Sequence, residues 1–86
     1  MRFTVVWQPH AEQELAEIWQ QSANREAVSA AANRMEQLLR TCPDRVGEER
    51  SFVDRIFFEG PLGMRFRLLF DDRVVQVLSV WDITRR

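Results

Sequence analysis

The sequence predicts a small α+β domain with the order β-α-α-β-β-β. An antiparallel helical hairpin is expected to pack on one face of a small, mainly antiparallel, twisted sheet. Three observations predict this fold. A short alternating apolar stretch opens the chain, two segments with helical spacing follow, and three β-type stretches separated by turn residues complete it. The 86 residues leave room for one domain, 1–86.

The composition is that of an ordinary globular chain and excludes several other classes. Twelve basic and 13 acidic residues give a net charge of -1, with 45% apolar and 29% charged residues. This balance excludes a disordered chain or a charged tail, and it provides no overall attraction to nucleic acid. No apolar run approaches the roughly 20 residues of a membrane span. With one cysteine, Cys42, and no signal-like start, we expect a reduced, cytoplasmic protein without membrane contact.

The first elements are a strand and a proline-started helix. Residues 2–7 alternate, with Phe3, Val5 and Trp7 on the apolar side, which predicts a strand. Proline suits the first turn of a helix because it needs no hydrogen-bond donor there, so Pro9 begins a helix over residues 9–22.

A second helix follows after a short connection, which predicts the helical hairpin. Asn24 is the expected N-cap and Pro43 the stop. Apolar residues recur at helical spacing and predict a buried stripe; they are Val28, Ala31, Ala32, Met35, Leu38, Leu39 and Cys42.

Three strands are predicted after a loop at residues 43–51. They cover residues 52–59, 64–70 and 73–81, with turns at 60–63 and 71–72. The last strand is almost continuously apolar, which indicates neighbouring strands on both of its sides.

Strand alternation predicts an arginine-bearing face that the helices leave open. The apolar side of the middle strand is Met64, Phe66, Leu68 and Phe70, so Arg65 and Arg67 point outward. We expect Arg55 to join them and Arg85 to extend the face. A two-residue turn at 71–72 would place Arg67 opposite Gln76 and Arg65 opposite Leu78. Two interpretations stay open: a surface that binds phosphate or carboxylate groups, and the polar outer face of any half-exposed sheet.

Other candidate residues favour structural roles. His10 is expected to be an exposed residue of the first helical turn, although a general base is the alternative. Glu12, Glu14 and Glu17 do not share one helical spacing, so a solvated face is expected rather than a metal site or a carboxylate pair. No cofactor motif is present, and the tryptophans are expected to pack rather than to stack on bases.

The chain resembles the RelE/ParE toxin superfamily of bacterial type II toxin–antitoxin systems. The resemblance rests on the order and spacing of four segments: residues 5–12, 15–19, 64–70 and 77–81, together with Pro43, Gly47 and Arg50 between them. It implies a plasmid-stabilisation-like toxin that inhibits growth and is neutralised by a cognate antitoxin. RelE-like members cleave mRNA on the ribosome, whereas ParE-like members poison DNA gyrase.

The resemblance also implies roles for two arginines. Arg65 matches the family's strand arginine that contacts the scissile phosphate in nuclease members, and Arg85 lies near a further basic residue. This chain departs from nuclease members because it has no lysine and no tyrosine, and His10 lies on a different element from their acid and base groups. Three hypotheses follow: a ParE-like or other non-nuclease toxin, a ribosome-dependent endoribonuclease, and a non-toxic, catalytically degenerate interaction module. The missing acid and base groups suit the first better than the second.

Overall fold

The computed structural model describes residues 2–49 and 54–84. Arg85 lies outside the described residues, so its predicted place on the basic face is untested. The elements are β1 (Thr4–Trp7), α1 (Pro9–Gln21), α2 (Arg25–Thr41), β2 (Glu48–Glu49), β3 (Asp54–Glu59), β4 (Leu62–Leu69) and β5 (Val74–Asp82). The predicted order is confirmed, with the two-residue strand β2 added inside the stretch that was expected to be a loop.

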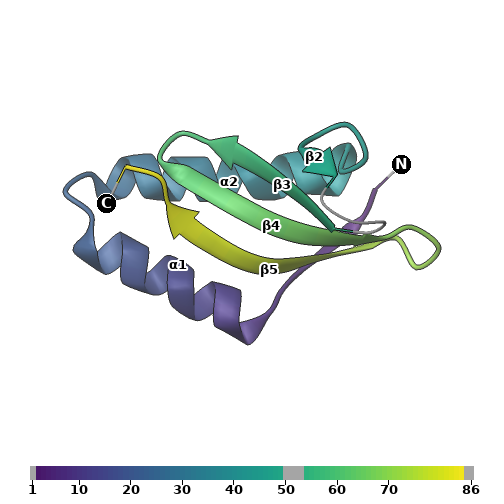
Figure 1. The fold of residues 1–86 in the computed structure, drawn as a ribbon, viewed down its shortest axis with the longest axis horizontal. Helices are drawn as coiled ribbons and strands as arrows, with labels where there is room; N and C mark the ends of the chain where they lie inside the picture. The colour runs from purple at the N-terminus through teal and green to yellow at the C-terminus, as the bar shows by residue number, and fades with distance from the viewer. Residues whose placement is uncertain (1, 50–53, 85–86) are drawn as a thin grey trace.

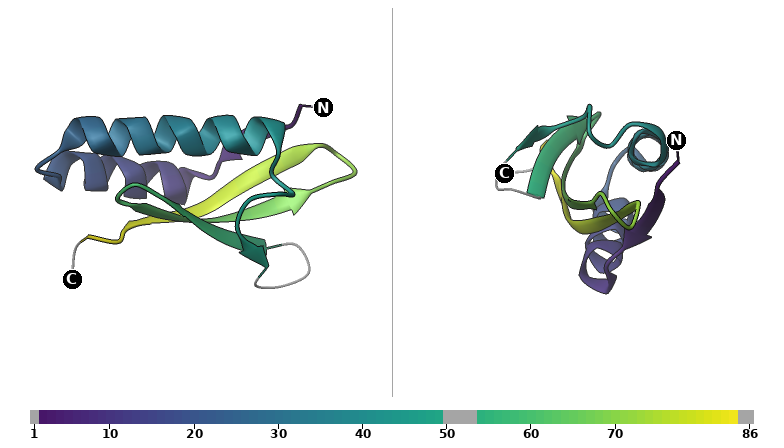
Figure 2. Two further views of the ribbon diagram at one scale, coloured as in Figure 1. Left: turned by 90° about the horizontal axis from the view of Figure 1, so that it is seen from above. Right: turned by 90° about the vertical axis from the view of Figure 1, so that its right-hand side faces the viewer.

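The strands form one sheet in the order β1-β5-β4-β3-β2. β1 runs parallel to β5, and the other neighbours are antiparallel. In Figure 1 α2 lies behind the sheet and α1 lies below it along β5, and the views of Figure 2 show both helices on the same side of the sheet. The helices therefore cover one face, and no element of the described residues covers the other, which is here called the open face. None of the described helices is long and apolar enough to cross a membrane.

Residues at the connection between α1 and α2 hold the two helices of the hairpin together. The Asn24 side chain accepts a hydrogen bond from the Ala27 amide at 3.1 Å, which caps α2. The Arg25 guanidinium donates to the carbonyls of Trp19 and Gln20 at 3.1 and 3.0 Å, so it satisfies acceptors that the end of α1 leaves open. It also lies 4.6 Å from the centroid of the Trp19 ring. These contacts join the end of α1 to the start of α2.

The core lies between the hairpin and the covered face of the sheet. α2 contributes Val28, Ala31, Met35 and Leu39, as its apolar spacing predicts. They pack with buried residues of the strands, which include Phe57, Leu62, Met64, Phe66, Leu68, Val75, Val77 and Val80. The Phe57 and Phe66 rings meet edge to face at 5.5 Å between centroids.

Two residues expected in the core lie elsewhere. Cys42 is half-buried because α2 ends at Thr41, and the fully buried position beyond the helix is taken by Pro43. Phe70 is 56% exposed because β4 ends at Leu69 and the chain has already entered the turn. Its ring meets Phe3 edge to face at 5.7 Å.

Two tight turns set the strand register. Gly60 adopts a φ of 55°, which lets β4 begin at Leu62, two residues earlier than predicted. At the other hairpin Leu69 pairs with Val74, so the predicted pairing of Arg67 with Gln76 is confirmed. The predicted pairing of Arg65 with Leu78 is wrong. An irregularity between Arg65 and Phe66 leaves one extra residue on β5, so Arg65 pairs with Ser79.

Candidate functional site

Arg65 is the exposed cation at the centre of the open face. It projects from β4 between the buried side chains of Met64 and Phe66, as strand alternation predicts. Within residues 2–49 and 54–84, Arg65 forms no ion pair and donates no side-chain hydrogen bond. Its pairing partners on the same face are Ile56 on β3 and Ser79 on β5, which are both uncharged. The guanidinium therefore keeps its donors available for an anionic ligand.

Arg67 also lies on the open face, but its charge is engaged. Its Nε donates to Asp54 Oδ1 at 2.8 Å and a terminal nitrogen lies 3.4 Å from Oδ2, across the β3–β4 pair. The hydrogen bond from Arg67 lowers the pKa of the Asp54 carboxyl, and the charges of Arg67 and Arg65 lower it further against the opposing effect of desolvation. The fork geometry makes Arg67 a cross-strand link rather than a free anion-binding group.

The Asp54–Arg67 pair predicts a pH-dependent contribution to stability. Because the folded pKa of Asp54 lies below its ordinary value of 3.8, the contribution is complete above that value. It is lost as the pH falls through the lower, folded pKa. Arg67 is 42% exposed, so we expect Asp54→Asn to cost about 1 kcal/mol or less at neutral pH. Urea unfolding of both proteins across this acidic range should show the difference shrinking; a constant difference would contradict the pair's role.

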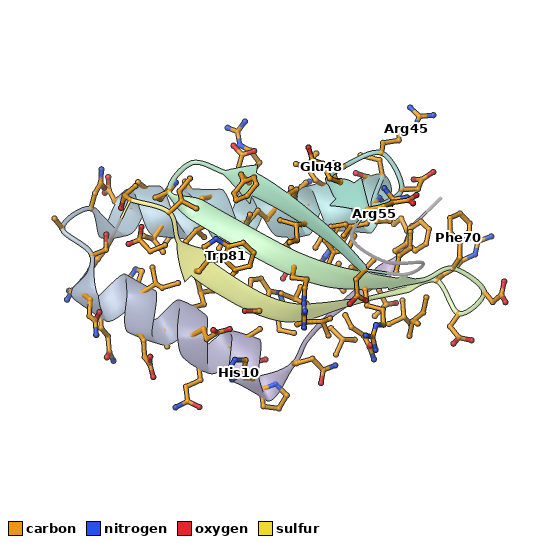
Figure 3. The ribbon with its side chains drawn as sticks, in the orientation of Figure 1. His10, Arg45, Glu48, Arg55, Phe70 and Trp81 are labelled. Atoms are coloured by element: carbon orange, nitrogen blue, oxygen red, sulfur yellow. The ribbon has the colours of Figure 1, made fainter. Side chains whose placement is uncertain are left out.

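Arg55 does not belong to the open face, contrary to the sequence prediction. It pairs with Phe66, so it shares the covered face with Phe57 and Phe66. Its side chain is 20% exposed and lies 3.2 Å from a carboxylate oxygen of Glu49 on β2. Figure 3 places it at the corner of the sheet near Glu48, at a distance from Trp81. The side-chain alternation of β3 is the reverse of the predicted one, because Phe57 is buried and Phe58 is exposed.

An aromatic pair occupies the other end of the open face. Trp81 on β5 pairs with Gly63 on β4, and its indole covers the glycine (Figure 3). A Cβ at Gly63 would lie 2.5 Å from indole atoms Cε2 and Nε1, so this position requires glycine. Phe58 on β3 meets Trp81 edge to face at 6.2 Å and is 55% exposed. Arg65 has no ion-pair partner among the described residues, and it lies near the exposed ring of Phe58 and the half-buried ring of Trp81. Such a combination binds either nucleic acid or a protein partner.

The edge of the open face is completed by side chains from α1. β1 pairs with β5 only as far as Val77, so the rest of this β5 edge faces α1. Glu14 accepts a hydrogen bond from the Val80 amide at 3.2 Å, and its other oxygen lies 3.5 Å from the Ser79 hydroxyl. His10 Nε2 lies 3.4 Å from that same oxygen, and the His10 side chain is 72% exposed. The predicted exposure of His10 is confirmed, whereas the contacts of Glu14 with β5 were not predicted from the sequence.

A groove of about 580 Å³ runs between α1 and α2 on the opposite side of the molecule. Its floor and walls are mainly apolar; they include Trp7, Leu15, Ala16, Trp19, Val28 and Ala32. Trp7 donates to Glu36 at 2.9 Å and Trp19 donates to Ser29 at 3.1 Å, so both rings are held in place with an apolar surface toward the groove. Trp19 is 41% exposed. Apolar grooves between helices accommodate apolar side chains of a partner segment.

Comparison with known proteins shows similarity at the level of structure. No protein-family model and no curated protein sequence matches this chain. The chromosomal ParDE toxin–antitoxin system from P. aeruginosa matches with a TM-score of 0.74 and 16% identity, over 95% of this chain and 97% of that chain. The RelBE2 toxin–antitoxin complex from Mycobacterium tuberculosis matches with a TM-score of 0.77 and 20% identity, over 95% and 99% of the two chains.

A third structure shares the fold over part of its length. TrmO from Pseudomonas aeruginosa matches with a TM-score of 0.64 and 20% identity, over 93% of this chain but 35% of TrmO. The two toxin–antitoxin matches instead span almost the whole of both chains. Two helices on one face of a mixed sheet, in this strand order, therefore make a RelE/ParE-like fold.

Proposed function

We propose that this protein is the toxin component of a type II toxin–antitoxin system, inhibiting growth until a cognate antitoxin binds it. The observation that carries the proposal is the match to chains of the ParDE and RelBE2 toxin–antitoxin complexes over nearly the full length. Arg65 supports it, because this exposed arginine has no ion-pair partner among the described residues and a toxin needs an accessible surface for its target. The target is either mRNA on the ribosome or DNA gyrase.

The antitoxin is expected to cover apolar surface that the chain cannot bury by itself. The groove between α1 and α2 offers such a surface, with Trp7 and Trp19 as large aromatic contacts. An amphipathic antitoxin segment that folds on binding fits this geometry.

Tightly induced expression in a bacterial host tests the proposal. Growth and the integrity of a reporter mRNA are followed together, with and without co-expression of the protein encoded beside the gene. Growth arrest that the neighbouring protein reverses supports a toxin. Cleaved mRNA would identify translation as the target, whereas intact mRNA during arrest would favour gyrase. Unimpaired growth would favour the non-toxic interaction module and would contradict the proposal.

Ala16→Arg is expected to disrupt antitoxin binding. Ala16 is exposed on α1 and lines the groove, so arginine there introduces a charge and a long side chain without disturbing the core. We expect binding to weaken by at least about 100-fold, equivalent to roughly 3 kcal/mol. Titration calorimetry against the antitoxin measures it. Gln13→Arg adds the same charge to the same helix at an exposed position outside the groove, and should leave binding unchanged. Equal affinity of both variants would exclude the groove.

A further inference from the structure

The groove between α1 and α2 has an acidic side chain at one end and a basic side chain at the other. Trp7, which precedes α1, bonds to Glu36 in the later part of α2, whereas Trp19 near the end of α1 bonds to the early part of α2. The groove therefore runs along both helices. Glu12 lines its first end, and Arg25 lies over the Trp19 ring at its second end.

Glu12 is the carboxylate at the first end that is left for a partner. The other carboxylate there, Glu36, is already engaged, because Oε1 accepts from Trp7 Nε1 at 2.9 Å and Oε2 accepts from Arg40 at 2.7 Å. Glu12 is exposed and forms no ion pair with any residue that the structure describes. A free carboxylate beside an apolar groove attracts a basic side chain, whose aliphatic part can lie on the apolar surface.

Arg25 gives the second end of the groove a positive charge that is fixed in place. The guanidinium donates to the carbonyls of Trp19 and Gln20 and lies 4.6 Å from the centroid of the Trp19 ring. These acceptors are uncharged, and no carboxylate in the described part of the chain pairs with Arg25. The guanidinium therefore keeps its full charge and has further donors to offer. A carboxylate of a partner would meet complementary charge at this end.

The two ends are separated by about two helical turns of apolar surface. Glu12 and Trp19 lie roughly 10 Å apart along the axis of α1, given the rise of a helix per residue. Leu15, Ala16 and Ala32 are among the residues that line the groove between them. Both indole N–H groups in the groove bond within the chain, so the rings require no hydrogen bond from a partner. A short amphipathic helix with apolar residues at positions i, i+3 and i+4 fits this surface.

We propose that the groove selects its antitoxin helix by the order of the charges on that helix. A Lys or Arg side chain of the partner pairs with Glu12, and an Asp or Glu side chain about two turns away lies beside Arg25. The inference rests on the proposed toxin function and adds which partner segment the groove accepts. Apolar contacts bind any amphipathic helix, whereas a helix with the reverse order of charges would place like charges together at both ends. Glu12 is therefore a specificity residue for the partner.

Titration calorimetry with the protein encoded beside the gene tests this assignment. Glu12→Arg should weaken binding by at least about 10-fold, because it replaces an attraction with a repulsion. Glu12→Gln should weaken binding less, and its difference from the unaltered protein should shrink as the salt concentration rises. Glu17→Arg makes the same change of charge at an exposed position of α1 outside the groove, so it should bind normally. Both arginine variants should keep the unfolding midpoint, because positions 12 and 17 are exposed.

Charge reversal on the partner identifies the pair. Each Lys and Arg of the neighbouring protein is changed to Glu in turn and titrated against Glu12→Arg, and one of these changes should restore the lost affinity. Equal affinity of Glu12→Arg and Glu17→Arg, or the lack of a restoring change, would overturn the inference and leave the toxin proposal intact. Dimerisation of the protein alone that Ala16→Arg abolishes would assign the groove to a second copy and would also overturn it. A neighbouring protein that neither binds nor relieves growth arrest would contradict the toxin proposal as well.

Discussion

Arg65→Ala is expected to abolish growth arrest while leaving the fold unchanged. Arg65 is exposed and makes no ion pair with any described residue, so its removal costs little stability. If Arg65 binds the reacting phosphate, its loss removes charge stabilisation that is worth about 100-fold or more in rate. Growth after induction and cleavage of reporter mRNA measure the functional effect, and urea unfolding measures the structural one.

Arg67→Ala is the matched control for this prediction, because both arginines lie on the open face of β4. Arg67 is linked to Asp54, so its removal should lower stability by about 1 kcal/mol or less while retaining most of the activity. The two variants should therefore show opposite patterns. Full toxicity of Arg65→Ala would show that the unpaired arginine does not contact the target.

Gly63→Ala is expected to destabilise the protein by about 1–3 kcal/mol, although it adds a single methyl group. The new Cβ would lie 2.5 Å from Trp81 Nε1 and Cε2, a separation that no relaxed contact reaches. The indole must move away from β4, and it then loses its edge-to-face contact with Phe58. Chemical denaturation measures the loss of stability, and a change in tryptophan fluorescence reports the displacement of the ring.

A double-mutant cycle provides the control. In a Trp81→Ala background the ring that the methyl group would meet is absent, so Gly63→Ala should cost much less than it does alone. The same cost in both backgrounds would place the strain in the backbone of β4 rather than in the indole contact.

Local patterns predicted the architecture correctly because each element carries a strong signal. The apolar stripe of α2, the Asn24 cap and the alternation of Met64, Arg65 and Phe66 all agree with the structure. The predicted strand pairing is wrong where one additional residue shifts the register between two strands. A single extra residue on β5 moved the partner of Arg65 from Leu78 to Ser79. Such a bulge depends on the packing of neighbouring strands, which no local spacing encodes.

The sequence by itself determined the fold class, the uncovered sheet face and the placement of Arg65 and Arg67 on it. These follow from periodicities of two and 3.6 residues, which act over short distances along the chain. The tertiary structure alone decided that Arg67 is engaged by Asp54 while Arg65 is not. It alone also brought Glu14 to β5, because the contacts of Glu14 with Ser79 and Val80 join residues more than 60 positions apart. Long-range contacts of this kind depend on how helix and sheet pack together, and that packing decides which side chains can act together.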